Sequence, residues 1–184
     1  MYSTSDFRNG LKILLETLPY EIVYFQHVKP GKGGAFVRTK LKNLLNGAVV
    51  EKTFRAGEKL AVPDVQDVDM QYLYNDGSFH FMHMETFEQI QVPSEIVGDR
   101  ALWLKENTLV RVLLFNGSVI SIELPAFIQL MVTDCDPGLK GDTVSGATKP
   151  AKLETGASVQ VPLFICQGDT LKIDTRTGQY VERV

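Results

Sequence analysis

Turn signals recur along this chain at short intervals, and they constrain its fold more than any other feature. The segments between them are short, and they alternate apolar with polar residues or stay apolar, as β-strands do. Most of the turns pair glycine with a second turn-forming residue: Asn9-Gly10, Asn46-Gly47, Ala56-Gly57, Asn75-Asp76-Gly77, Asn116-Gly117, Pro137-Gly138, Thr155-Gly156, Gln167-Gly168 and Thr177-Gly178. Short strands at this spacing are typical of small β-barrels or sandwiches, so we expect an all-β protein.

The clearest hairpin runs from Leu109 to Leu124 around Asn116-Gly117, because Asn-Gly favours the type I′ turn that matches strand twist. Helix is scarce. One short helix is expected from Ser94, which would cap it, to Ala101. The pattern divides the chain into three β modules of about sixty residues each, small enough that we expect packed junctions between some of them. The predicted boundaries give modules at 1–64, 65–126 and 127–184.

A second hairpin has a distinctive apex. The runs Ile22–Val28 and Phe36–Lys42 alternate like strands, and the loop between them contains Pro30-Gly31-Lys32-Gly33-Gly34. Proline fixes φ and the glycines permit positive φ, so backbone chemistry shapes the apex and Lys32 alone carries a functional group there. A solvated turn lysine is the ordinary alternative. A Walker A loop would need Ser or Thr directly after its lysine, and a Schiff-base lysine would need a desolvated pocket.

Charge is distributed unevenly along the chain. The formal net charge is −3, yet the first 64 residues carry 10 Lys and Arg against 6 Asp and Glu, a balance of +4, and the remainder carries −7. Lys29, Arg38, Lys40 and Lys42 lie on the predicted hairpin, and the last three share one strand face by the period of two. They are candidate phosphate-binding residues, although edge strands also carry lysine simply to remain solvated.

Other chemistry-bearing residues give weaker signals. His80 and His83 form H-x-x-H, but strand positions three apart face opposite sides, and no third ligand is evident. No nucleophile and base occur at a recognisable spacing, so neither a catalytic residue nor a metal is predicted. Cys135 and Cys166 lie outside any C-x-x-C pair, and together with an N-terminus that lacks a signal-peptide core they predict free thiols in a reducing cytoplasm. No apolar run approaches the length of a membrane span.

Four motifs in order along the chain resemble bacterial elongation factor P. The first three are Asp6-Phe7-Arg8-Asn9-Gly10, the apex from Lys29 to Arg38, and Tyr72-Leu73-Tyr74-Asn75-Asp76-Gly77 with Phe81-Met82 and 85–89. The most specific is the C-terminal set: Lys149-Pro150-Ala151, Gly156, Val159, Val161-Pro162, Ile165 and Gly168. The resemblance covers essentially the whole chain.

That resemblance implies an SH3-like, KOW-type barrel followed by two OB-fold barrels, with the outline of a transfer RNA. It also implies a monomeric, non-catalytic factor that contacts both ribosomal subunits, rRNA and the peptidyl-tRNA, between the peptidyl and exit sites. Such a factor stimulates peptide-bond formation and relieves stalling at consecutive prolines.

By the same resemblance Lys32 is a modification site, extended covalently with a lysyl-type or other group by a dedicated enzyme, and no cofactor is implied. Pro30, Gly31, Lys32, Gly33 and Gly34 would form the loop that contacts peptidyl-tRNA and rRNA. Gly141, Asp142 and Thr143 would lie near the small subunit and the exit-site codon. A generic single-strand nucleic-acid-binding OB protein is the alternative, and the acidic balance of residues 65–184 argues against it.

Overall fold

A computed structural model describes residues 1–31, 33–137 and 147–184. The described residues form antiparallel strands joined by turns and loops, with one short α-helix and two 3₁₀ segments, and this β architecture is the one that the turn spacing predicts. Contacts divide it into two compact units, residues 1–68 with 112–121 and residues 69–111 with 122–184. The module boundaries expected after residues 64 and 126 stay a prediction.

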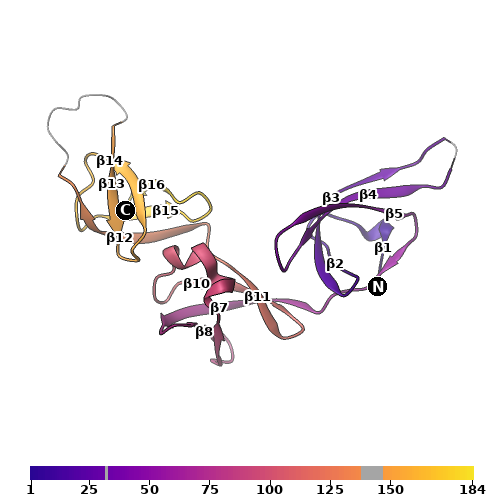
Figure 1. Ribbon diagram of the computed structural model, residues 1–184, viewed down its shortest axis with the longest axis horizontal. Helices are drawn as coiled ribbons and strands as arrows, with labels where there is room; N and C mark the ends of the chain where they lie inside the picture. The colour runs from indigo at the N-terminus through magenta and orange to yellow at the C-terminus, as the bar shows by residue number, and fades with distance from the viewer. Residues whose placement is uncertain (32, 138–146) are drawn as a thin grey trace. The chain divides into compact units, whose positions relative to one another are not determined.

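The N-terminal barrel is a four-stranded sheet in the order β2-β3-β4-β5, formed by Lys12–Leu15, Leu18–Val28, Phe36–Asn43 and Val49–Arg55 (Figure 1). Two short strands, β1 (Tyr2–Ser3) and β6 (Lys59–Leu60), pair with each other, and an isolated bridge from Leu14 to Ala61 connects β2 to the chain just beyond β6.

Inward-facing positions on these strands form the core of the N-terminal barrel. The pattern is clearest on β4, where buried Val37, Thr39 and Leu41 alternate with exposed neighbours. Phe54 is fully buried, and its ring meets the edge of Phe7 at a centroid distance of 5.6 Å. The row also contains two polar residues with partners: the Thr39 hydroxyl donates to the carbonyl of Lys52, and Asn43 Oδ1 accepts from the N–H of Leu45.

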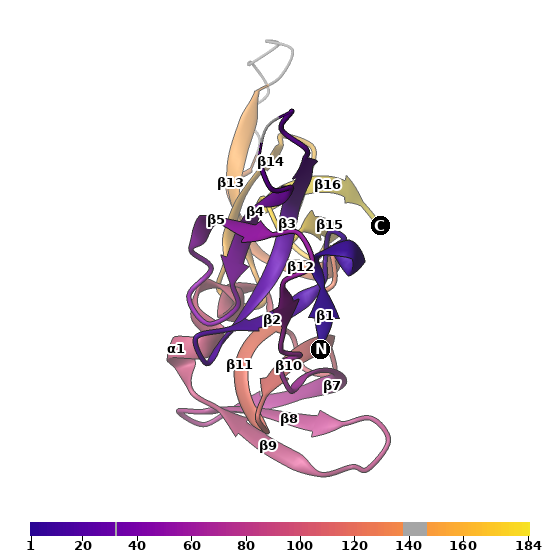
Figure 2. The same cartoon turned by 90° about the vertical axis from the view of Figure 1, so that its right-hand side faces the viewer.

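The central sheet has the order β11-β10-β7-β8-β9 (Figure 2). Its strands are β7 (Val65–Asn75), β8 (Phe79–His83), β9 (Gln89–Val92), β10 (Leu109–Phe115) and β11 (Ser118–Glu123). Helix α1 (Ser94–Val97) follows β9 and passes into the 3₁₀ segment η2 (Gly98–Trp103). Pro93, not Ser94, occupies the N-cap position and makes no side-chain cap, so the expected serine cap is wrong; Gly98 at φ +54 ends the α-helix.

The C-terminal sheet has the order β14-β13-β12-β15-β16. Its strands are β12 (Phe127–Cys135), β13 (Thr148–Leu153), β14 (Ser158–Pro162), β15 (Thr170–Asp174) and β16 (Gln179–Arg183). The edge strands β14 and β16 contact each other, which curls the sheet into a barrel. Inside lie Leu130, Leu153, Val161, Leu171 and Ile173, each at most 1% exposed.

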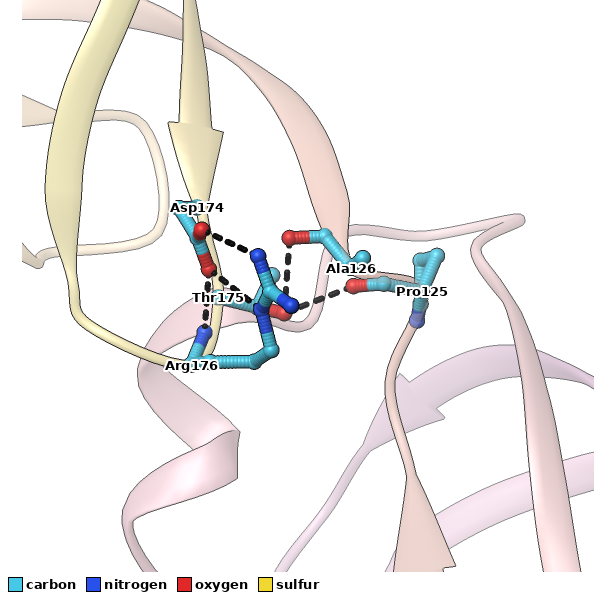
Figure 3. A network of polar contacts seen from close by, with 5 residues as sticks. All are labelled: Pro125, Ala126, Asp174, Thr175 and Arg176. Carbon is cyan, nitrogen blue, oxygen red and sulfur yellow. Dashed lines mark hydrogen bonds and ion pairs between the residues drawn. The ribbon is translucent and has the colours of Figure 1, made fainter.

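Within the second unit the C-terminal barrel is fastened to the segments that precede it. Trp103 of η2 packs against the barrel core, and the Lys105 ammonium pairs with Glu154 at 2.9 Å. The Thr175 hydroxyl donates to the carbonyl of Pro125 at 2.6 Å (Figure 3). Beside it, the Arg176 guanidinium donates to the Asp174 carboxylate. That hydrogen bond from Arg176 lowers the pKa of Asp174 to about 2. These contacts fit the expectation of packed module junctions.

Two hairpin turns with the same geometry have very different sequences. Asn116 and Gly117 both have positive φ, as the predicted type I′ turn requires. Glu16 and Thr17, which join β2 to β3, also have φ of +50 and +75. A β-branched threonine in this region is strained, so the second turn is held by its flanking strands rather than by its own preference.

Replacing Glu16-Thr17 with Asn-Gly should therefore raise the free energy of unfolding by about 1 kcal/mol, because both residues accept positive φ. The exposed ion pair between Lys52 and Glu16, at 3.9 Å, is lost but contributes little. Urea denaturation followed by circular dichroism measures the change. Replacing Asn116-Gly117 with Glu-Thr should lower the free energy of unfolding by a similar amount. If neither variant changed the free energy of unfolding, the strain argument would be contradicted.

Gly178 offers a test of the junction. It has φ +69, and a Cβ there would lie 3.1 Å from Cζ2 of Trp103. Gly178→Ala should destabilise the chain by about 1 kcal/mol more than Gly168→Ala, because Gly168 shares the positive φ but has open space around it. Thermal unfolding followed by fluorescence of the single tryptophan measures both. Equal losses would show that Trp103 moves aside without cost.

Candidate functional site

Strands β3 and β4 form a continuous antiparallel arm that extends beyond the N-terminal barrel (Figure 1). Their pairing runs from Tyr20 opposite Asn43 at the base to Val28 opposite Phe36 at the outer end, with one bulge near Val23. At the base the arm shares the barrel core, since Ile22 and Leu41 are fully buried. The predicted hairpin is confirmed, and it is longer at its base than the sequence indicates.

The apex of the arm is exposed throughout its described part, which comprises Lys29, Pro30, Gly31, Gly33 and Gly34. Gly33 has φ +121, whereas Gly31 and Gly34 do not adopt the positive φ that glycine permits. A Cβ on Gly31 or Gly34 would meet nothing within 4 Å. Lys32, the predicted modification site, lies outside the described residues.

Arg38, Lys40 and Lys42 lie on the exposed face of β4, as the period of two predicts. Lys40 pairs with Glu51 of β5 at 3.5 Å. Arg38 and Lys42 form no ion pair with any part of the chain that the structure describes. The Arg38 guanidinium instead lies 5.6 Å from the ring centroid of Phe36, which holds it near the outer end of the arm.

Positive charge therefore predominates on this face of the arm. The residues opposite Arg38 and Lys40 on β3 are Gln26 and Tyr24, both exposed and uncharged. A row of cations with hydrogen-bonding and aromatic neighbours can bind phosphates and stack on bases.

The predicted codon-facing residues Gly141, Asp142 and Thr143 lie outside the described residues. The strand that follows them is fixed by a lysine that the sequence analysis noted only as part of a signature. Lys149 is 7% exposed, and its ammonium donates to the carbonyl of Asp136 at 2.5 Å. The signal that could have identified it is its place in the inward-facing row with Ala151 and Leu153, where lysine is unusual.

The two histidines of the H-x-x-H pair, His80 and His83, have separate structural contacts. His80 is buried, stacks on Tyr74 at 4.3 Å and bonds through Nε2 to Asp76 Oδ1 at 2.8 Å. That hydrogen bond lowers the pKa of the Asp76 carboxyl. His83 Nδ1 accepts from the backbone N–H groups of Glu85 and Thr86. Residues 1–31, 33–137 and 147–184 contain no group of three His, Cys, Asp or Glu side chains that could hold a metal.

The cysteines are free thiols, as the sequence predicts. Cys135 is partly buried and its thiol donates to the carbonyl of Ile165 at 3.7 Å, while Cys166 is exposed. Among the described residues no helix has the length and apolarity needed to cross a bilayer.

Three family models match the chain in order. "Elongation factor P (EF-P) KOW-like domain" matches residues 3–60, "Elongation factor P (EF-P) OB domain" matches 65–122, and "Elongation factor P, C-terminal" matches 128–183. The expected architecture of one KOW-like and two OB domains is confirmed by these matches and by the three sheets.

Known proteins agree with the family models. "Elongation factor P" of Pelotomaculum thermopropionicum is 56% identical, with 100% of both chains covered. "Elongation factor P" of Nitratidesulfovibrio vulgaris is 55% identical, again over 100% of both chains. The solved structure of "Eukaryotic translation initiation factor 5A from Methanococcus jannaschii" has a TM-score of 0.55 at 22% identity, covering 67% of this chain and 91% of that one, which is evidence for the fold alone.

The domain matches and the full-length identity show that the chain belongs to the elongation factor P family of translation elongation factors.

Proposed function

We propose that this chain binds the ribosome between the peptidyl and exit sites, beside the peptidyl-tRNA, and relieves stalling at consecutive prolines. The observation that carries the proposal is the β3–β4 arm, which is anchored in a barrel core and bears exposed cations along one face toward a Pro-Gly-Lys apex. On the ribosome this arm would direct its apex toward the peptidyl-transferase centre. As a ribosomal factor, the chain would act in the cytoplasm.

The chemistry of proline makes positioning the useful intervention. Its ring restricts the geometry of both the nascent chain and the attacking amine, so peptide-bond formation is slow because alignment is poor. A stiff arm that braces the end of the transfer RNA lowers the entropic cost of that alignment. The ribosome would supply the catalysis, and the factor itself would need neither a nucleophile nor a cofactor.

Lys32 is the proposed contact and modification site at the apex, where a modifying enzyme would extend it with a lysyl-type or other group. A longer side chain lets a slender tip reach further without adding bulk to the arm. Exposure of the flanking Gly31 and Gly33 agrees with this role, since the enzyme and the RNA both need access. Gly141, Asp142 and Thr143 are proposed to contact the small subunit near the exit-site codon.

Translation of a template with three consecutive proline codons tests the proposal in a reconstituted system. The chain should shorten the stall, and Lys32→Ala should reduce that stimulation by about tenfold or more, because lysine is the only residue of segment 30–34 with a charged side chain. Lys59→Ala, an exposed lysine on β6 of the same barrel, should leave it unchanged. Failure of the chain to relieve the stall, with or without an added mass on Lys32 in the peptide mass spectrum, would refute the function.

The cationic face makes a separate prediction about salt. Arg38→Ala should weaken ribosome binding and reduce the slope of log affinity against log salt by about 1, as loss of one phosphate contact does. Lys40→Ala should reduce it less, because Glu51 already neutralises part of that charge. Ribosome binding measured between low and moderate salt gives both slopes. Identical slopes for wild type and Arg38→Ala would show that this face does not meet phosphate.

A further inference from the structure

The turn that joins β8 to β9 can be followed in Figure 2. It contains an exposed aromatic residue on an unfavourable backbone. Phe87 is 68% exposed and has φ +60. The four other non-glycine residues with positive φ among those described are Glu16, Thr17, Asn107 and Asn116, all polar. A bulky apolar side chain in this region is uncommon and strained, and strain of this kind is frequent at functional sites.

The rest of the turn holds that geometry in place. The His83 ring accepts from the N–H groups of Glu85 at 3.0 Å and Thr86 at 3.2 Å, and the Phe87 N–H donates to the His83 carbonyl at 3.0 Å. The His83 N–H in turn donates to the Glu88 carbonyl at 2.9 Å. Backbone groups and an imidazole therefore define the turn, so asparagine or glycine could occupy position 87 at lower conformational cost.

Packing does not explain the phenylalanine either. Its ring makes no aromatic or cation–π contact with any residue that the structure describes, and most of its surface faces solvent. Met84, at the start of the same turn, is 39% exposed. Two apolar side chains thus stand at one hairpin end, on a backbone that is rigidly held and strained.

The charged side chains of the turn itself are acidic. Segment 84–89 has the sequence Met-Glu-Thr-Phe-Glu-Gln, so it contains Glu85 and Glu88 but neither lysine nor arginine. Both glutamates are exposed. Two carboxylates repel a phosphate backbone and attract a basic protein surface, which sets this turn apart from the cationic arm.

We propose that Phe87 anchors a protein-docking surface: its ring enters an apolar pocket with a basic rim on a partner protein, and Met84, Glu85 and Glu88 contact that rim. Aromatic side chains in desolvated pockets dominate the energy of many interfaces, and a rigid turn delivers one without an ordering cost. The inference rests on the proposed function in one respect, because the partner is then a protein component of the ribosome.

Two substitutions separate docking from a structural role. Phe87→Ala and Phe87→Asn should each weaken binding to ribosomes about tenfold or more, while Phe87→Asn should unfold at the same temperature as wild type or higher. Phe164→Ala, which removes another exposed aromatic side chain (60%) in the same unit, is the control and should bind normally. A lowered unfolding temperature in Phe87→Asn, or unchanged ribosome binding in both variants, overturns the proposal.

A charge reversal at the turn identifies the class of partner by whether it weakens or strengthens ribosome binding. Glu85→Lys should weaken binding several-fold at low salt if the partner surface is basic protein, whereas it should strengthen binding if the turn faces RNA. A photoreactive phenylalanine analogue at position 87 should crosslink to a ribosomal protein. Strengthened binding, or crosslinks to rRNA alone, overturns the proposal.

The two hypotheses can fail separately. If wild type shortens the proline stall but the position 87 variants bind normally, the docking surface is refuted and the proposed function stands. If ribosome binding depends on Phe87 but the chain does not shorten the proline stall, the proposed function is refuted and the docking surface stands. A wild-type chain that does not bind ribosomes refutes both.

Discussion

The pairing between β3 and β4 is the constraint on which the candidate site depends. One ladder runs from Tyr20 and Asn43, within the barrel, to Val28 and Phe36, at the outer end of the arm. The inner half is fixed by burial of Ile22 and Leu41, and backbone hydrogen bonds carry that orientation outward into a segment without a core of its own. An isolated hairpin of this kind would be only marginally stable in water.

The C-terminal barrel shows why a sequence signature can be dominated by packing. Ala151, Val159 and Ile165 of the signature are buried in the barrel core, and Gly156 and Gly168 have φ of +86 and +89. These positions specify a fold. Lys149 differs, since its buried ammonium donates to the backbone carbonyl of Asp136, just after β12. An apolar side chain of similar size would leave that carbonyl without this partner.

Local patterns predicted a large part of this structure. Alternation predicted both hairpins and the exposed face of Arg38, because a period of two depends only on neighbouring residues. The contacts of His80 with Tyr74 and Asp76 depend on tertiary and turn geometry, and no spacing in the sequence indicates them. The strained Phe87 was missed for a related reason, since its φ is imposed by hydrogen bonds to His83 and not by its own propensity.

The exposed face of the β3–β4 arm and the turn at Phe87 differ in the sign of their charge. On the arm Arg38 and Lys42 form no ion pair within the described residues, although Glu21 lies opposite Lys42, whereas the charged residues of segment 84–89 are both glutamates. If the arm binds RNA, a second basic surface would add nonspecific RNA binding, because phosphate attraction carries no sequence information. Acidic surfaces oppose that spread. The net −7 of residues 65–184 would therefore weaken nonspecific RNA binding outside the arm, and the two glutamates beside Phe87 suit a basic protein surface.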